Sequence, residues 1–307
     1  MTALITHADC LNHVTPEGHP ERVARLEHVL HALAGLDLNR ISAPLATDAD
    51  VLRIHPQRYL DRIEGGVPMQ GSAQLDADTW LSPGSEQAAR RGAGAVLRAV
   101  DLVLGGEETN AFCAIRPPGH HAESETAMGF CLFGNAALAA KYALDHHGLA
   151  RVAVVDFDVH HGNGTQDLLW DEPRALTITS QQMPLWPGSG APSERGAHDN
   201  VLNIALPPES DGAVMRAAYE AQVLPRLRGF APDLIILSAG FDAHQDDPLA
   251  SLNWSTDDFR WLTRELCTLA AQLCGGRLVS TLEGGYDLEA LSASALAHVE
   301  ELLEASK

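Results

Sequence analysis

This sequence lacks the features typical of membrane proteins, disulfide-rich proteins and nucleic-acid-binding proteins. No run approaches the roughly 20 consecutive apolar residues that span a bilayer. The N-terminus has neither a basic start nor the apolar core of a secretory signal. The five cysteines are scattered and include no Cys-x-x-Cys pair, as is typical of reduced thiols. We therefore expect a cytoplasmic protein that does not contact membranes.

Basic residues are also scarce. The chain has 21 Lys and Arg against 41 Asp and Glu, so its formal net charge is −20. Such a charge repels phosphate backbones and anionic lipid surfaces, which argues against nucleic acid as a partner. Apolar residues make up 45% of the 307 residues, as in an ordinary globular protein with a sizeable core. A homo-oligomer is compatible with this composition, and the sequence leaves the oligomeric state open.

Short apolar runs alternate with helical patterns along the chain. Helices are expected at residues 82–106, with Ser82 or Ser85 as the cap, and at 20–33, 135–148, 211–230 and 255–276. The expected strands cover residues 111–115, 151–158, 175–179, 200–206, 233–240 and 277–285. Several are apolar throughout, like strands buried on both faces of a parallel sheet. This alternation predicts one α/β domain, residues 1–307, with a mostly parallel sheet and helices on both faces.

Polar residues of unusual kinds follow four of the predicted strands. They lie in residues 116–131 (RPPGHHAESETAMGFC), 156–165 (DFDVHHGNGT), 237–249 (LSAGFDAHQDDPL) and 282–287 (LEGGYD). Functional groups of an open parallel sheet gather at the carboxyl ends of its strands. We therefore expect the four segments to meet at one edge of the sheet.

One pattern among these residues indicates a metal site. Asp156, Asp158 and His160 alternate, so they would share one face of a strand that continued through them. Asp158 and His160 are side chains of the kinds that bind zinc, and Asp242 is the best third candidate. Two carboxylates and one imidazole leave coordination positions for water and substrate, as in catalytic sites. The alternative is that Asp158 and Asp242 are helix caps.

A second pattern indicates acid–base chemistry. His120 and His121 follow two prolines and a glycine, which places them in a rigid loop. Imidazole titrates near neutrality, and Asp156 and Asn163 could each orient one of the two rings. Tyr286 follows two glycines and could donate a hydrogen bond to an oxyanion, although such a tyrosine can also simply pack. Together with a metal, these groups would suit hydrolysis of an amide or ester carbonyl.

The remaining histidines have simpler interpretations. His161 should point away from His160 on an extended chain, which makes it a poor ligand. His146 and His147 end a predicted helix, where an imidazolium complements the helix dipole. Three others are expected at the surface: His28, His31 and His298.

In their order and spacing, the four segments resemble the signatures of the histone deacetylase family. The resemblance covers roughly residues 5–300 and is to the class II-like branch, which includes bacterial histone deacetylase-like amidohydrolases and acetylpolyamine amidohydrolases. It implies the arginase/deacetylase fold, a single α/β domain whose mostly parallel sheet has about eight strands. It also implies a zinc-dependent hydrolase with Asp158, His160 and Asp242 as ligands and iron(II) as an alternative metal.

The resemblance further implies a role for each remaining site residue. His120 and His121 would be the tandem catalytic histidines, held by Asp156 and Asn163, and Tyr286 would polarise the carbonyl. The implied ligands of a structural potassium ion are Asp156 and the main-chain oxygens of Asp158, His160, Thr179 and Ser180. The implied substrate contacts are Gly129, Phe130, Trp186, Leu249 and Gly284, with Trp186 where phenylalanine is more usual.

The substrate that we expect is an acyl-lysine side chain in a protein or peptide. Relatives that prefer polyamines carry a glutamate where this sequence has Leu249, and leucine offers no ion pair to a distal ammonium. An acetylpolyamine deacetylase is therefore the second hypothesis. A manganese ureohydrolase on the related fold would need more carboxylates. A non-catalytic acyl-lysine binding module typically lacks the tyrosine or a histidine, and both are present here.

Overall fold

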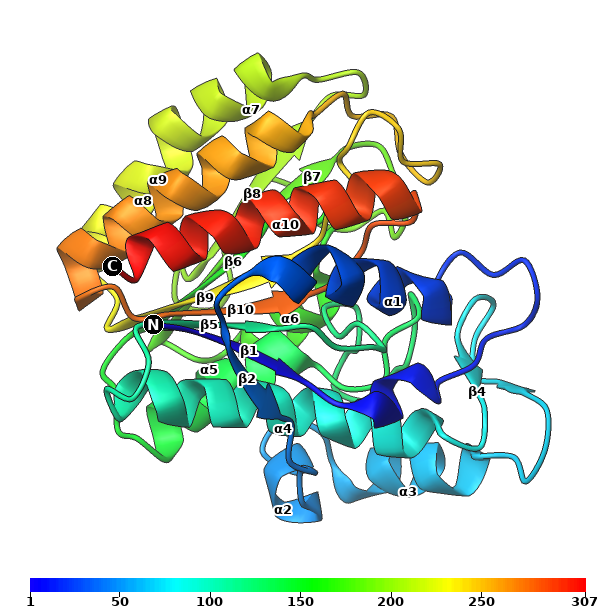
Figure 1. The fold of residues 1–307 in the computed structure, drawn as a ribbon. Coiled ribbons are helices and arrows are strands. Elements are labelled where there is room, and N and C mark those ends of the chain that lie inside the picture. The colour runs from blue at the N-terminus through cyan, green and yellow to red at the C-terminus, as the bar shows by residue number, and fades with distance from the viewer.

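The computed structural model describes residues 1–307. An eight-stranded sheet runs through the molecule in the order β2-β1-β5-β10-β9-β6-β7-β8 (Figure 1). Every pairing within it is parallel. This confirms the predicted α/β class with a parallel sheet.

The strands agree with the apolar runs except at the N-terminus and at several ends. Two strands in the less regular first part of the chain were not predicted, β1 (Thr2–Thr6) and β2 (Asn39–Ser42). The others are β5 (Asn110–Cys113), β6 (Val152–Asp156), β7 (Ala175–Gln182), β8 (Val201–Leu206), β9 (Leu234–Ala239) and β10 (Leu278–Leu282). A separate antiparallel hairpin consists of β3 (Ala73–Gln74) and β4 (Trp80–Leu81).

Helices cover both faces of the sheet. Figure 1 shows α4 (Ser85–Leu104) and α5 (Asn135–Asp145) on one side, and α1 (Val23–Ala32), α9 (Thr256–Cys274) and α10 (Leu288–Ala305) on the other. The shorter helices are α2 (Asp48–Val51), α3 (Gln57–Gly66), α6 (Asn163–Leu169), α7 (Gly212–Ala218) and α8 (Leu224–Phe230). None of the helices combines the length and apolar character needed to cross a lipid bilayer.

Two helix predictions need correction. The helix expected at 211–230 is divided into α7 and α8 by a π-helical turn, Tyr219–Val223, and Pro225 in the first turn of α8 has no N–H to continue the ladder. Neither Ser82 nor Ser85 caps α4, whose N-cap is Gly84. The Ser85 hydroxyl accepts instead from the Ser82 amide and bonds to His13.

His298 lies in the core, so its expected surface position is wrong. It is fully buried on α10, and its ring packs against Phe112 and Phe241. Burial is tolerated because both ring nitrogens find hydroxyl partners, Thr263 at 2.7 Å and Ser280 at 2.9 Å. Burial lowers the pKa of His298 to about 3, so the ring is neutral in the folded protein.

Candidate metal and acid–base site

The order of the strands brings the four polar segments together. Strands β5, β10, β9 and β6 are consecutive neighbours in the sheet, and one segment follows each of them. Because all four strands are parallel, their carboxyl ends lie at one edge. The predicted convergence of the segments is therefore a direct consequence of the sheet order.

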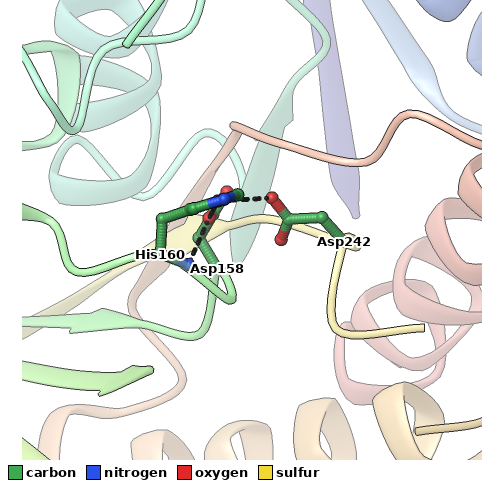
Figure 2. A group of neighbouring side chains, drawn as sticks. All are labelled: Asp158, His160 and Asp242. Atoms are coloured by element: carbon green, nitrogen blue, oxygen red, sulfur yellow. Dashed lines mark hydrogen bonds and ion pairs between the residues drawn. The ribbon is translucent and has the colours of Figure 1, made fainter. Parts of the chain in front are cut away.

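The proposed metal ligands form a buried cluster at this edge. The Nδ1 atom of His160 lies 3.1 Å from Asp158 Oδ1 and 3.1 Å from Asp242 Oδ2 (Figure 2). Potential ligand atoms of the three residues lie within 4.8 Å of one another. Asp158 and Asp242 are fully buried, and His160 is 8% exposed.

A bend in the chain, rather than a continuous strand, aims Asp158 and His160 at the same point. Strand β6 ends at Asp156, whose carboxylate accepts the Asp158 amide at 3.0 Å, and the Asp158 carboxylate then accepts the His160 amide at 2.9 Å. The prediction that Asp156, Asp158 and His160 share one face of a continuous strand is therefore wrong, because the strand ends at Asp156. Asp158 and His160 meet because each aspartate accepts a hydrogen bond from the amide two residues later, which bends the backbone.

Neither proposed aspartate ligand is a helix cap. The N-cap residue of the helix after Asp158 is Gly162, which has no capping side chain. The N-cap residue of the helix after Asp242 is Ser255. The Asp158 carboxylate accepts the Gly284 amide, and the Asp242 carboxylate accepts the Val159 amide. The helix-cap alternative is excluded.

The charges at this cluster fit a divalent cation. Burial opposes the charged form of His160, yet hydrogen bonds with Asp158 and Asp242 raise the pKa of its ring to about 10. A buried carboxylate without a positive partner is costly. The two buried carboxylates of Asp158 and Asp242 therefore attract positive charge strongly. Two carboxylate donors and one imidazole donor are a ligand set suited to zinc and also to iron(II).

The tandem histidines lie beside this cluster, with their rings 3.8 Å apart between centroids. His120 Nδ1 lies 3.0 Å from Asp156 Oδ2, and His121 Nδ1 lies 2.7 Å from Asn163 Oδ1. Burial disfavours charge on His120, but the carboxylates of Asp158 and Asp156 outweigh it and raise its pKa well above the usual value. Burial and the neighbouring His120 instead lower the pKa of His121. One ring is therefore held charged and the other neutral.

A narrow pocket leads to these groups. Its volume is about 220 Å³, and the phenol ring of Tyr286 packs edge-on against Phe130, 5.7 Å between centroids. Trp186 meets His121 edge-on at 4.7 Å and is 41% exposed, so it extends to the surface. The lining consists of Asp78, His121, Gly129, Phe130, His160, Leu185, Trp186, Leu249 and Tyr286.

Comparison with known proteins identifies the family of this chain. A model of the histone deacetylase domain matches residues 19–302. The chain belongs to the histone deacetylase family. A histone deacetylase-like amidohydrolase from Pseudomonas aeruginosa is 42% identical over 290 residues, which are 92% of this chain and 76% of the relative. A probable deacetylase from Archaeoglobus fulgidus is 36% identical over 298 residues, covering 94% of this chain and 82% of the relative.

A solved structure agrees with this assignment. The crystal structure of the HDA15 HD domain superposes with a TM-score of 0.91 at 32% identity and covers 98% of this chain and 90% of that chain. The resemblance read from the four segments is thereby confirmed. The chain is a hydrolase of the histone deacetylase family, whose members act on acylated substrates.

Not every residue implied as a substrate contact lines the narrow pocket. Gly129, Phe130, Trp186 and Leu249 do so, whereas Gly284 lies behind the cluster, where its amide donates to Asp158 at 2.8 Å. A side chain at position 284 would run into the carboxylates, so glycine is required there for close approach.

The residues implied as potassium ligands also lie next to one another. Thr179 pairs with Asp156 in the register of β6 and β7, and Ser180 is the next residue of β7. The Thr179 hydroxyl is buried without a hydrogen-bond partner. His161 points elsewhere, as expected, and bonds to Ser189 and Gln166.

Sequence reasoning missed Asp78, which lines the narrow pocket. Asp78 lies in the turn between β3 and β4, and its carboxylate accepts the Gly129 amide at 3.2 Å. It belongs to none of the four segments, and only its spatial contact with Gly129 reveals it.

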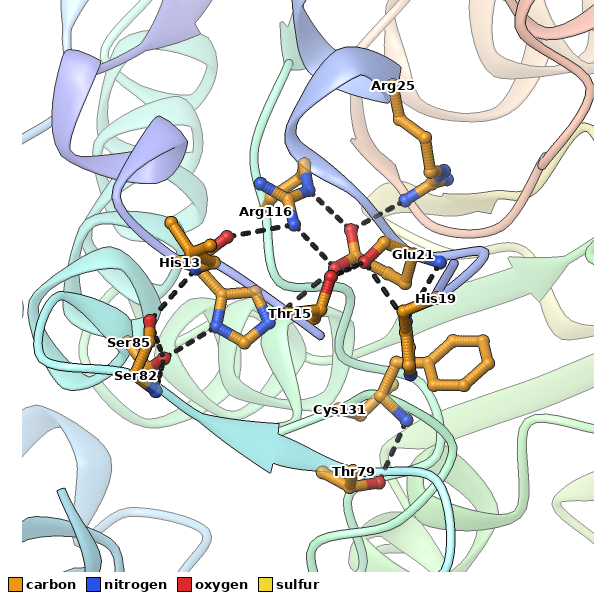
Figure 3. A network of polar contacts seen from close by, with 12 residues as sticks. His13, Thr15, His19, Glu21, Arg25, Thr79, Ser82, Ser85, Arg116 and Cys131 are labelled. Atoms are coloured by element: carbon orange, nitrogen blue, oxygen red, sulfur yellow. Dashed lines mark hydrogen bonds and ion pairs between the residues drawn. The ribbon is translucent and has the colours of Figure 1, made fainter. Parts of the chain in front are cut away.

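A buried ionic network behind the site was missed as well (Figure 3). Glu21 lies between Arg25 and Arg116, and all three are fully buried. Arg25 donates to the main-chain oxygens of Glu283 and Gly285, beside Tyr286. Charged residues on the inward face of the amphipathic helix at 20–33 were the available signal in the sequence.

Proposed function

We propose that this chain is a zinc-dependent deacetylase that hydrolyses the acyl amide of Nε-acyl-lysine in proteins or peptides. The observation that carries the proposal is the buried Asp158, His160 and Asp242 cluster at the end of a narrow pocket, with His121 and Tyr286 beside it. The aromatic walls suit the alkyl chain of a lysine. Acid–base and hydrogen-bonding groups are concentrated at the inner end.

The proposed cation would be held by Asp158, His160 and Asp242, with iron(II) as the alternative to zinc. When bound, it supplies Lewis-acid activation of the acyl carbonyl and of water. We further propose a structural potassium ion at Asp156 and the main-chain oxygens of Asp158, His160, Thr179 and Ser180. The buried, unpartnered Thr179 hydroxyl and the acidic surroundings support a cation in this region.

His121 is the proposed general base. Its lowered pKa keeps the ring neutral, and Asn163 accepts from Nδ1, which leaves Nε2 free to take a proton. The orientation of Asn163 is fixed because its amide nitrogen donates to Glu123 at 2.8 Å. His121 removes a proton from the attacking water and passes it to the departing lysine amine.

His120 and Tyr286 stabilise the charge that develops during attack. His120 remains an imidazolium beside Asp156, so it contributes a positive charge next to His121 rather than a second base. Tyr286 donates its hydroxyl proton in a hydrogen bond to the carbonyl oxygen as that oxygen becomes negative. Burial raises the pKa of this phenol well above its usual value, so it stays protonated.

A specific observation keeps acetylpolyamines as the second candidate substrate. Leu249 provides no ion pair for a polyamine, which favours acyl-lysine, but the carboxylate of Asp78 lines the same pocket. A comparison of kcat/KM for an acetyl-lysine peptide, acetylspermidine and acetylputrescine decides between them. We expect the peptide to be preferred, and a clear preference for either polyamine would contradict the proposed substrate.

We also propose a cytoplasmic location. The five cysteines are all unpaired and buried, which is compatible with a reducing compartment. Fractionation of the cells that produce the protein tests this location, and recovery outside the cytoplasm would contradict it.

A further inference from the structure

A buried carboxylate outside the proposed catalytic set bridges two walls of the pocket. Asp247 lies five residues beyond Asp242, in the turns that follow β9, and is only 7% exposed. Its Oδ2 atom accepts the Tyr286 amide at 2.7 Å and the Asp287 amide at 3.4 Å. Its Oδ1 atom accepts the Leu249 amide at 3.0 Å. One side chain therefore holds both Tyr286 and Leu249 by their backbones.

Main-chain amides, rather than a basic side chain, stabilise the carboxylate of Asp247, although burial and the nearby charge of Asp242 raise its pKa to about 7. Asp247 forms no ion pair with any Lys, Arg or His, and three main-chain N–H groups are its partners. It also lies at the start of α10, which begins at Leu288, where the helix dipole favours negative charge. Only an acceptor at both oxygens satisfies all three donors, so a neutral amide cannot replace it without losing at least one bond.

Tyr286 needs such a restraint because of the residues before it. Gly284 and Gly285 give the chain unusual freedom, and Gly285 has φ of 121°, which side-chain-bearing residues rarely adopt. Arg25 holds this segment by the carbonyl oxygens of Glu283 and Gly285. Asp247 holds it from the other side by the amide of Tyr286 itself.

We propose that Asp247 is a positioning residue that fixes the Tyr286 hydroxyl at the reacting carbonyl and couples it to the rim at Leu249. This inference rests on the role of Tyr286 in the proposed function. A hydrogen-bond donor stabilises a developing oxyanion only at a well-defined distance, so small displacements of the phenol lower kcat.

The variant that tests this role is Asp247→Asn. The carboxamide keeps the shape of the side chain but places an NH₂ group against either the Tyr286 or the Leu249 amide. The matched control is Asp246→Asn, the same chemical change at the adjacent residue, whose side chain is 63% exposed. We expect D247N to lower kcat by about 100-fold with little change in KM, and D246N to leave both unchanged.

A double-mutant cycle separates positioning of Tyr286 from a general loss of structure. Because Tyr286→Phe removes the hydroxyl that Asp247 positions, D247N in the Y286F background should lower kcat by no more than about 3-fold. If D247N lowered kcat by about 100-fold in the Y286F background as well, the proposal would be overturned, because Asp247 would then act independently of the phenol.

A second measurement does not depend on activity. The chain has four tyrosines, so protein labelled with ¹⁵N-tyrosine gives four amide signals. D247N should shift the Tyr286 amide and accelerate its hydrogen exchange, while the other three signals stay in place and report an intact fold. An unchanged Tyr286 signal would overturn the proposal. Absence of wild-type turnover would instead contradict the proposed function and leave this amide measurement valid.

Discussion

His120 and His121 are chemically identical neighbours that the protein makes different. His120 has a carboxylate partner, Asp156, whereas His121 has a neutral amide partner, Asn163, and a charged ring beside it. Raising one pKa and lowering the other fits the proposed division between a charge-stabilising ring and a base. The contrast between Asp156 and Asn163 is readable from the sequence, but the distances that make these two residues partners come from the fold.

Tyr286→Phe tests the proposed oxyanion donor by removing a single hydroxyl group. Removing the hydroxyl should raise the transition-state free energy by about 3 kcal/mol, which is roughly a 100-fold loss of kcat. Bound zinc, measured by elemental analysis, should be unchanged because Tyr286 is not among the proposed ligands. Full turnover of an acetyl-lysine peptide by Y286F would contradict the role of the phenol.

Some residues of the candidate site could be predicted from the sequence and others could not. Asp158, His160 and Asp242 are marked by their types and spacing. Asp78 and Asp247 act through backbone amides of residues far along the chain, 51 and 39 positions away. Such contacts depend on how loops pack at the sheet edge, which no local pattern encodes.

At the scale of elements, charged side chains tie α1 to the loops that carry the site. Arg25 on α1 reaches the loop after β10, and Arg116 begins the loop of His120. Glu21 joins the two arginines, and His13 lies 3.5 Å from the same carboxylate. Burial alone would raise the pKa of Glu21, but Arg116 and its other neighbours lower it to about 2.

Glu21→Gln should therefore destabilise the protein. It leaves two buried guanidinium groups without their carboxylate, which costs about 3–5 kcal/mol. Urea unfolding near neutral pH measures the loss, and E17Q, at an exposed glutamate of the same loop, should change stability by less than about 0.5 kcal/mol. Equal stability of E21Q and wild type would show that the ionic network is not stabilising.

The pKa of Glu21 also fixes how this contribution depends on pH. Because its folded pKa is lowered from 4.5 to about 2, the stabilisation is fully present above pH 4.5 and is lost as the pH falls towards 2. The stability difference between wild type and E21Q should shrink over that interval. A difference that stays constant would contradict the assignment.

Element boundaries were predictable only where local signals were strong. Apolar runs located the central strands, and Ser255 with Asp258 forms the capping box at the start of α9. Strand β2 was missed because it is an exposed edge strand with polar residues. The interruption between α7 and α8 was missed because its amphipathic pattern continues through the π-helical turn.

At the scale of the whole molecule, the parallel sheet explains why four distant segments form one site. Alternation of strands and helices predicts the fold class, yet it does not give the order β5-β10-β9-β6 that assembles the segments. That order comes from the structure alone. His298 was expected at the surface but is buried in the core. Its burial is possible because Thr263 and Ser280 form hydrogen bonds with both ring nitrogens.

Neutral His298 should make global stability depend on pH. Its folded pKa of about 3 lies below its ordinary 6.5, so between these values the unfolded chain binds a proton that the folded protein does not. Stability should fall with decreasing pH over this interval, by up to about 1.4 kcal/mol per pH unit from this residue. Denaturant unfolding of His298→Gln should show a shallower slope, and His31→Asn, at an exposed histidine, is the control. Identical slopes for wild type and H298Q would contradict this account.

The central claim is that the Asp158, His160 and Asp242 cluster supports metal-dependent removal of an acyl group from lysine. The most direct measurement is acetate release from an acetyl-lysine peptide by the protein as purified, after chelation, and after reloading with zinc. We predict that chelation abolishes turnover and that zinc restores it when a single zinc ion is bound per chain. Protein that binds zinc but turns over no acyl-lysine, or that requires two manganese ions per chain, would contradict the claim.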